Sequence, residues 1–419
     1  MGTSLAAMLY NGGQLSHRRS QQKPVLLYNT MTRRKEPFVP GPDPVTIYVC
    51  GITPYDTTHL GHAFTYVFFD VLIRYLHYLG HTTRYVQNVT DVDDDILRRS
   101  RELGIAWNQL AEEQTRRYQE DMAALNVLPP DVYPRASQEI PKIVEIVQSL
   151  LQKGYAYQAD GNIYFQVGLY PSYGQLSRLA KSEMLPIANQ RGNDPNDPRK
   201  RDPLDFVLWQ RSAPDEPSWD SPWGPGRPGW HIECSAMSLR HLGSTIDIHG
   251  GGHDLVFPHH ESEIAQSENY TGEHPFARYW VHTAMVYLGS QKMSKSLGNL
   301  VMVRDLLSRY SPGAVRLLLL SHRHTEPWAY EERDMAAASD LSSLLKEAAA
   351  GETAPNAPLE MEEAAKFLDA MEDDLDTPEA IATLRELARG ILRDRSSHTD
   401  AVPARTLLRE LSSTLGLQL

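Results

Sequence analysis

The sequence predicts an α/β protein built on a parallel sheet, with a helical C-terminal region. The segment "VTIYVCG" from Val45 is a buried-strand pattern that ends in a glycine turn, and an apolar helix and a second strand follow it. "TIDIHGGG", which ends at Gly252, repeats the strand and the glycine turn. Beyond Val301 the apolar residues recur at helical spacing almost throughout. Strand, helix and strand in this order predict a βαβ unit, and therefore parallel strands.

The elements can be placed in order along the chain. The first strand is bounded by Gly51, and "GHAFTYVFFDVLIRYLHYLG" is a helix that we expect to end at Gly80. "TTRYVQNVTDVDD" is a second strand that runs into an acidic loop, and a helix is expected at about 107–125. A proline-rich boundary, another helix, short strands and polar turns then interrupt the sheet before "TIDIHGGG" resumes it.

Composition limits the compartment and the partners. The chain has 419 residues, enough for two or three domains, and no apolar run long enough to span a membrane. Residues 1–22 lack a signal peptide's apolar stretch and cleavage site, and with only Cys50 and Cys234 a disulfide framework is not expected. We therefore predict a cytoplasmic protein without a membrane partner. The net charge of −12 argues mildly against a large nucleic-acid footprint but leaves room for a local basic patch.

Two short motifs offer groups that suit phosphate. "HLGH" (His59–His62) stands where a loop enters a helix, so both imidazoles project from the same side of the helix's positive end. "KMSKS" (Lys292–Ser296) places two lysines and two serines in a glycine-flanked loop. Taken singly, each motif is common, and two surface histidines or a plain Lys/Ser loop would explain it as well.

Together the two motifs resemble the pair in class I aminoacyl-tRNA synthetases, in the same order and about 230 residues apart. The resemblance implies a Rossmann-like (HUP) nucleotide-binding sheet with an insertion and a C-terminal helical bundle. It also implies ATP as a substrate, with Mg²⁺. The implied ATP-binding residues are His59, Gly61, His62, Lys292, Met293, Ser294, Lys295 and Ser296. Of these, the two histidines and two lysines are the implied catalytic residues, because they would stabilise charge as the α-phosphate is attacked.

We accordingly expect five segments. They are a flexible N-terminal extension (1–22), the first half of the nucleotide-binding catalytic domain (23–130), a connective insertion (131–203), the second half with the KMSKS loop (204–305) and the helical bundle (306–419).

A dense group of ligand-type side chains lies in "HGGGHDLVFPHHESE", which ends at Glu263. Isolated buried cysteines are ordinarily inert core residues. Here Cys50 and Cys234 have partners in His259 and Glu263, which are four residues apart and share a helix face. The four side chains predict a Cys₂HisGlu zinc site. The neighbouring His253, His260 and Glu261 are not expected to be ligands.

The same four residues fall on the ligand positions of the cysteinyl-tRNA synthetase family, which the chain resembles from about residue 25 to 415. In that family zinc binds the thiolate of the substrate, L-cysteine. Zinc prefers thiolate to hydroxyl, so the metal can separate cysteine from serine where a polar pocket could not. The implied cysteine pocket consists of Thr90, Trp230, His249, Gly250, Gly251, Gly252 and Asp254. For Trp230, core packing is the alternative role.

Two branches of the family share this core, and the sequence favours the mycothiol-pathway ligase, which joins cysteine to the amine of glucosaminyl-inositol. Phe64, Gln87 and Asp95 stand where the synthetase commonly has basic residues. The chain also ends at Leu419 after one helical bundle, where the synthetase typically continues into a basic anticodon-reading domain. Nearby aspartates are expected either to serve the acceptor's amine and hydroxyls or to form a solvated loop or helix start: Asp91, Asp93 and Asp94.

Other features resemble the synthetase. "YNTMTRRKEPFVP" and "HHESEIAQSEN" are synthetase-like, and Glu263 retains the fourth zinc ligand. A truncated cysteine–tRNA ligase is therefore the alternative hypothesis. A third is an inactive paralogue that acts as a binding protein, and the intact motifs argue against it. A monomer is expected in each case.

Overall fold

The fold was examined in a computed structural model, which describes residues 23–55, 58–289, 291–293, 298–356, 361–397 and 401–419. Its centre is a four-stranded parallel sheet in the order β10-β9-β3-β4. The inner strands are β9 (Ile246–Gly252) and β3 (Val45–Ile52), and the outer ones are β10 (Ala277–Thr283) and β4 (Thr83–Val89). The predicted parallel sheet is confirmed.

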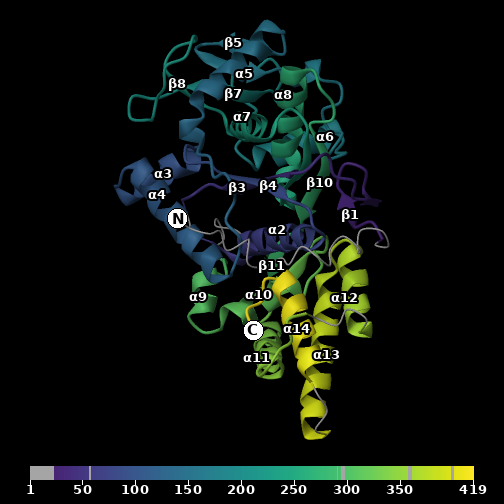
Figure 1. The fold of residues 1–419 in the computed structure, drawn as a ribbon. Helices are drawn as coiled ribbons and strands as arrows, with labels where there is room; N and C mark the ends of the chain where they lie inside the picture. The colour runs from purple at the N-terminus through teal and green to yellow at the C-terminus, as the bar shows by residue number, and fades with distance from the viewer. Residues whose placement is uncertain (1–22, 56–57, 290, 294–297, 357–360, 398–400) are drawn as a thin grey trace, which may run out of the picture.

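Helices cover both faces of this sheet. α2 (Leu60–Tyr78) packs against β4, β9 and β10 on one side and against C-terminal helices on the other. It is buried on nearly all sides, which explains its apolar sequence. α7 (Trp230–Leu242) covers β3 and β4 on the opposite face, and α8 (Glu261–Thr271) packs beside α7. Figure 1 shows α2 between the sheet and the C-terminal helices.

The segment that interrupts the sheet forms a second, antiparallel sheet in the order β5-β6-β7-β8. It lies at the end of the molecule opposite the C-terminal helices (Figure 1). The elements between β4 and α7 are α3 (Asp94–Leu103), α4 (Trp107–Ala124), α5 (Ile140–Gln152), β5 (Ala156–Ala159), β6 (Asn162–Phe165), α6 (Lys181–Asn189), β7 (Phe206–Arg211) and β8 (Gly226–Pro228).

The predicted C-terminal helical bundle is also confirmed. A small sheet precedes and joins it, in the order β12-β11-β13. Its strands are β11 (Val286–Leu288), β12 (Gln291–Lys292) and β13 (Trp328–Tyr330). The helices are α9 (Val303–Leu307), α10 (Pro312–Leu320), α11 (Glu332–Ala349), α12 (Glu362–Glu372), α13 (Thr377–Ser397) and α14 (Val402–Thr414).

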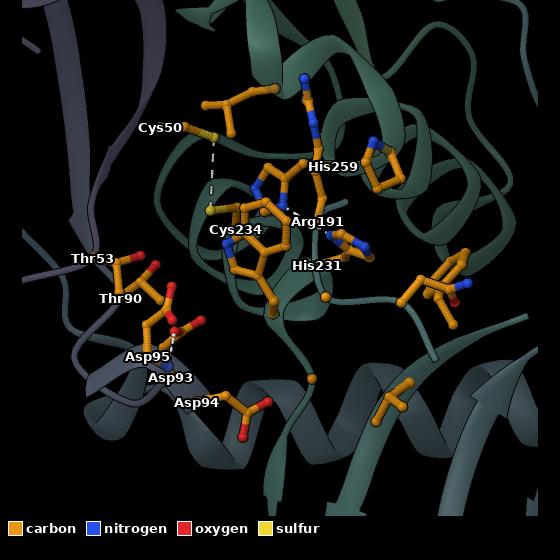
Figure 2. Close-up of a pocket in the computed structure, with 18 of the residues that line it drawn as sticks. Cys50, Thr53, Thr90, Asp93, Asp94, Asp95, Arg191, His231, Cys234 and His259 are labelled. Atoms are coloured by element: carbon orange, nitrogen blue, oxygen red, sulfur yellow. Dashed lines mark hydrogen bonds between the residues drawn. The ribbon is translucent and has the colours of Figure 1, made fainter. Parts of the chain in front are cut away.

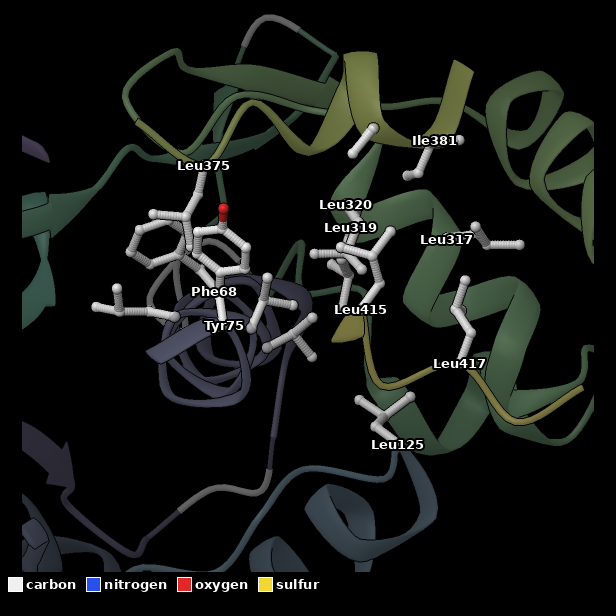
Figure 3. Packing of buried hydrophobic residues seen from close by; sticks show 14 of the residues in the cluster. Phe68, Tyr75, Leu125, Leu317, Leu319, Leu320, Leu375, Ile381, Leu415 and Leu417 are labelled. Carbon is white, nitrogen blue, oxygen red and sulfur yellow. The ribbon is translucent and has the colours of Figure 1, made fainter. Parts of the chain in front are cut away.

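The bundle is joined to α2 by a continuous apolar core (Figure 3). Within this core Arg316 of α10 is 1 % exposed and pairs with Asp70 of α2, which is equally buried. Arg316 also donates to the backbone oxygens of Leu125 and Leu415, at 2.9 and 2.6 Å. Removing one partner of a buried ion pair typically costs about 3–5 kcal/mol, because the other charge is left buried and uncompensated, so both residues of this pair are needed where the bundle meets α2.

An antiparallel hairpin, β1 (Leu26–Asn29) with β2 (Arg34–Pro37), lies beside β10. The backbone N–H of Thr30 donates to the oxygen of Trp280 in β10. On its other side the hairpin meets the turn before α13, where Asp374 accepts from the N–H of Tyr28. The hairpin therefore connects the sheet to the bundle.

Among the helices that the structure describes, none is both long enough and apolar enough to cross a lipid bilayer.

Candidate active site and metal-binding cluster

A cavity of about 1050 Å³ opens beyond the carboxyl ends of the parallel strands, between them and the inserted sheet. Ligands of open parallel sheets bind at this edge. The cavity is lined at its base by Cys50 and Cys234, and along one side by the end of β4 and the start of α3. Figure 2 shows the two cysteines and His259 grouped together, with Thr90 and Asp93 below Cys234 in the view.

Cys50 owes its position to an irregularity in β3. The pairing with β4 shifts between Val49 and Ile52, so the strand carries one extra residue where Cys50 stands. The neighbouring Gly51 is required by the tight approach of β4, because a Cβ there would lie 1.6 Å from the backbone oxygen of Asn88. The bulge thus turns the Cys50 side chain toward α7, which supplies Cys234.

Four buried side chains have the spacing of ligands around one metal. The ligand atoms of Cys50, Cys234, His259 and Glu263 all lie within 4.8 Å of one another. The two Sγ atoms are 3.7 Å apart, Cys50 Sγ is 3.5 Å from Glu263 Oε1, and His259 Nε2 is 3.2 Å from the same oxygen. A tetrahedral zinc would set these three separations at about 3.8, 3.6 and 3.4 Å. The predicted residues thus come together.

A second set overlaps the first: Cys50, His249, His260 and Glu263 also lie within 4.8 Å of one another. Cys50, Cys234 and His259 line the cavity, whereas His249 and His260 are not among its lining residues. The two histidines of the second set are therefore turned away from the space where a substrate could bind, and Cys50 is its one member that lines the cavity. Glu263 belongs to both, since Oε1 faces His259 and Oε2 lies 2.9 Å from Nε2 of His249.

Burial governs the protonation of this cluster. It raises the pKa of Cys50, and the hydrogen bond and charge of Cys234 and the charge of Glu263 act in the same direction. Burial likewise raises the pKa of the Glu263 carboxyl. It lowers the pKa of His259 and His260, and neighbouring histidines lower both further, so the imidazoles are neutral. Neutral imidazoles are ligands for metal ions, and a divalent cation would favour the ionised thiols and carboxylate.

Two aromatic side chains support His259. The Trp230 ring stacks on it with 4.4 Å between ring centres, and Nδ1 of His231 lies 2.9 Å from its Nδ1. His231 was not singled out from the sequence. Its position three residues before Cys234 on α7 is the signal that could have identified it, because such residues share a helix face.

The "HLGH" motif forms the start of α2 as predicted. His59 is the N-cap residue, and its Nδ1 accepts from the N–H of Gly61 at 3.1 Å. The rings of His59 and His62 stack, with centres 3.8 Å apart, and all three residues line the cavity. A Cβ at Gly61 would lie 2.9 Å from the His59 ring, so glycine allows this stack.

The "KMSKS" segment begins at the same cavity. Met293 is buried and lines it, and Lys292 is paired through its backbone with Tyr287 of β11. Ser294, Lys295 and Ser296 lie outside the described residues. The chain that follows returns to "HLGH", where the N–H of Leu60 donates to the oxygen of Val301 at 2.9 Å. The two motifs therefore border one space.

The predicted cysteine pocket divides into two groups. Thr90, Trp230, Gly252 and Asp254 line the cavity, whereas His249, Gly250 and Gly251 are not among its lining residues. Packing explains the two glycines without a ligand. A Cβ at Gly250 would lie 2.0 Å from the Phe69 ring, and one at Gly251 would lie 2.9 Å from the side chain of Leu255.

Phe64 and Gln87, which stand where the resemblance implies basic residues, are both buried and are not among the residues that line the cavity. Phe64 packs edge-on against Trp328. Gln87 donates to the hydroxyl of Tyr118 at 2.6 Å and accepts from that of Tyr85 at 2.7 Å. Neither side chain can set the charge of the entrance, because neither reaches it.

The aspartate run has structural partners. Asp91 accepts from the N–H and hydroxyl of Ser137 at 2.9 and 2.6 Å. Asp93 is the N-cap of α3, and burial raises its pKa to about 6. Asp94 pairs with Arg227 of β8. Asp93, Asp94 and the half-exposed Asp95 line the cavity and Asp91 does not, so this run both starts α3 and borders the cavity.

Comparisons with known proteins agree with this geometry. The family described as "tRNA synthetases class I (C) catalytic domain" matches residues 39–340, and the DALR domain matches 366–419. The fold resembles that of Mycobacterium tuberculosis methionyl-tRNA synthetase in complex with methionyl-adenylate (TM-score 0.61, 15 % identity, 89 % of each chain). It also resembles a putative arginyl-tRNA synthetase from Campylobacter jejuni (TM-score 0.57, 12 % identity, 90 % of this chain and 93 % of the other). Fold and site together define a class I aminoacyl-tRNA synthetase type of protein.

Two sequence relatives narrow the class. A cysteine–tRNA ligase from Dehalococcoides mccartyi is 46 % identical over 398 residues, which cover 94 % of this chain and 86 % of the relative. A cysteine–tRNA ligase from Methylococcus capsulatus is 47 % identical over 400 residues, which cover 93 % and 85 %. The chain belongs to the cysteinyl-tRNA synthetase family.

Proposed function

We propose that this protein is a cysteine–tRNA ligase. It activates L-cysteine with ATP as an adenylate, releasing pyrophosphate, and then transfers the cysteinyl group to tRNA, releasing AMP. The observation that carries the choice of acceptor is the pair of cysteine–tRNA ligases that are 46–47 % identical over more than nine-tenths of the chain. The mycothiol-pathway reaction, which the sequence favoured, has no support among these relatives.

The buried positions of Phe64 and Gln87 weaken the case for an amino-sugar acceptor, because that case rested in part on their standing where the synthetase commonly has basic residues, and neither side chain lines the cavity. The inserted sheet and its loops bring five cationic side chains to the cavity lining, of which two are paired with carboxylates that also line it: Arg191, Arg199, Lys200, Arg211 and Arg227. Positive charge at a cavity wall favours a phosphate-bearing acceptor. Acidic residues line the same cavity, so this charge is local and agrees with an overall acidic chain.

For the first step, the residues "HLGH" are proposed to hold ATP. The N-terminus of α2 presents backbone N–H groups and its positive dipole end to the cavity, where His59 and His62 stand. The cysteine carboxylate attacks the α-phosphorus and the bond to pyrophosphate breaks. The charge that develops on the phosphate oxygens would be stabilised by these histidines together with Lys292 and Lys295. Mg²⁺ would accompany the triphosphate.

The metal is proposed to be zinc, held by Cys50, Cys234, His259 and Glu263. Three of its members, Cys50, Cys234 and His259, line the cavity, and the three separations given above fit a tetrahedron. When bound, zinc would offer a coordination position to the thiolate of cysteine, which serine cannot match. Trp230, Thr90 and Asp254 are proposed to surround the amino acid, because all three line the cavity that the cysteines and His259 also line.

The test is a direct comparison of acceptors. Purified full-length chain would receive ATP, labelled cysteine and either cysteine tRNA or glucosaminyl-inositol, with mass spectrometry of the products. The expected result is cysteinyl-tRNA and AMP, with no amide product. Efficient amide formation without charging of tRNA would overturn the acceptor assignment. Cysteine-dependent exchange between ATP and pyrophosphate, measured without any acceptor, tests activation separately.

A further inference from the structure

A line of hydrogen-bonding groups runs from the N-terminal hairpin to the metal-binding cluster. The hydroxyl of Thr30 lies 2.8 Å from Nδ1 of His282, and Nε2 of His282 lies 2.7 Å from Nδ1 of His260. Nε2 of His260 in turn lies 3.3 Å from Sγ of Cys50. All four side chains are buried. A hydroxyl in the hairpin is thus linked to one of the proposed metal ligands.

The direction of these hydrogen bonds follows from the two ends of the line. A metal-ligating cysteine is a thiolate and can only accept, so His260 must donate from Nε2. A neutral imidazole carries one N–H, so Nδ1 of His260 accepts from Nε2 of His282. Nδ1 of His282 is then left as an acceptor, and the hydroxyl of Thr30 is the donor that it faces. The whole line points toward Cys50.

We propose that Thr30 is a positioning residue for the metal site. Its hydroxyl holds His282 in the tautomer that donates to His260, and His260 holds the thiolate of Cys50 toward the cavity. Partners of this kind, one step removed from a metal, orient its ligands and tune its affinity. The proposal rests on the metal site proposed above and extends it to a residue outside the cluster.

The surrounding contacts fix Thr30 where this role needs it. Its N–H donates to the oxygen of Trp280 at 2.8 Å, and Oδ1 of Asn29 accepts from the N–H of Trp280 at 3.1 Å. These bonds hold the hairpin beside β10, the strand that carries His282. On the other side, Asp374 accepts from the N–H of Tyr28 at 2.7 Å. The hydroxyl is therefore placed by backbone bonds from two directions.

The experiment compares three variants of the full-length protein after its metal has been replaced by Co²⁺. Thr30→Val removes the hydroxyl with little change in shape, and Thr30→Ser keeps it. Thr32→Val is the matched control, because Thr32 lies in the same hairpin turn and its hydroxyl donates to the backbone oxygen of Asn29, at 3.4 Å, and not to the line of histidines. The readouts are Co²⁺ affinity against a competing chelator, the thiolate-to-cobalt absorption band, and the KM values for cysteine and ATP in pyrophosphate exchange.

Thr30→Val is expected to bind Co²⁺ about tenfold more weakly, with a shifted absorption band and a raised KM for cysteine but not for ATP. Thr30→Ser and Thr32→Val should behave as wild type. Wild-type affinity and absorption in Thr30→Val would overturn the proposal, and so would an equal loss in Thr32→Val, which would indicate general loosening of the hairpin. Wild-type protein that binds no Co²⁺ would overturn the metal site as well. If the chain charges an amine and not tRNA while Thr30→Val still binds Co²⁺ weakly, the acceptor assignment falls and this proposal stands.

Discussion

The Sγ atoms of Cys50 and Cys234 lie 3.7 Å apart, although 184 positions separate the two residues in the chain. A disulfide would bring them to about 2.05 Å, whereas two thiolates on one zinc stand about 3.8 Å apart. The fold therefore places the cysteines at the spacing of shared metal ligands. The strand bulge at Cys50 and the packing of α7 on β3 produce this spacing together.

The first prediction concerns Cys234. Cys234→Ala removes a thiolate from the cluster, and we expect metal content to fall from one zinc per chain to near zero. Cysteine-dependent pyrophosphate exchange should fall by at least about 100-fold, because the metal is proposed to bind the substrate's sulfur. Metal analysis of the purified protein and exchange assays check this.

Ser235→Ala is the matched control for Cys234→Ala. Ser235 is buried on the same helix, and its hydroxyl donates a long hydrogen bond, 3.5 Å, to the backbone oxygen of His231. Its variant should keep the metal. A Cys234→Ala protein with full zinc and full activity would contradict the assigned ligand set.

The second prediction separates the two overlapping ligand sets. His259→Ala should lose the metal, because His259 belongs to the set that faces the cavity. His260→Ala should still bind one metal per chain, with affinity lower by about tenfold, since His260 supports Cys50 from behind. Chelator competition measures both affinities. The reverse order of losses would assign the metal to the set that contains His249 and His260.

The third prediction concerns Lys295, which is implied by the "KMSKS" motif and lies outside the described residues. Lys295→Ala should lower the rate of adenylate formation by about 100-fold, while the affinity for cysteine changes little. The reason is that its charge partner develops only in the transition state. Single-turnover adenylate formation and equilibrium cysteine binding separate the two quantities, and Lys346→Ala on the surface of α11 is a charge-matched control. Equal losses of rate and affinity would show that Lys295 only binds substrate.

The fourth prediction concerns the pH dependence of the contact between hairpin and bundle. Burial raises the pKa of Asp374 to about 6, above its usual value of 3.8. The folded protein therefore binds this proton more tightly than the unfolded chain, so stability falls as pH rises from about 4 to 6. The free energy of unfolding of wild type, minus that of Asp374→Asn, which cannot ionise at this position, should be larger at pH 5 than at pH 7 by about 1 kcal/mol.

Urea unfolding of wild type and Asp374→Asn at the two pH values checks this difference, and other carboxylates cancel because both proteins carry them. Asp43→Asn, at an exposed carboxylate whose oxygen lies 3.4 Å from Nδ1 of His81, is a comparison outside the contact. A difference between wild type and Asp374→Asn that stays constant with pH would contradict a raised pKa.

Periodicity and local motifs were enough to predict the fold class. The strand and glycine patterns at Val45 and Ile246 predict parallel strands because both strands are buried along most of their length. In β3 this burial appears as an apolar run with one polar residue, Thr46, whereas Asp247 and His249 interrupt the apolar residues of β9. The helix that follows "HLGH" could be predicted equally well, because its N-cap residue and its apolar residues are adjacent in the chain.

The acceptor of the cysteinyl group could not be predicted from such local patterns. Phe64 and Gln87 stand where the family resemblance implies basic residues, but whether a side chain faces a cavity depends on elements far away in sequence. Trp328 covers Phe64, and Tyr118 bonds Gln87. The sequence shows which residue is present, and only the packed structure shows that neither reaches the entrance.

The side chains available for phosphate and metal binding can be identified from the sequence alone. They are two motifs suited to phosphate, two cysteines, and a histidine- and glutamate-rich segment with Glu263 four residues after His259. These are local patterns, set by residue type and helix spacing. Which of these side chains face the cavity, and which support them from behind, depends on the tertiary structure. It turned His259 to the cavity, placed His249 behind Glu263, and joined Thr30 to Cys50 through His282 and His260. Such contacts join different strands and helices, and their distances depend on how those elements pack, which no local pattern encodes.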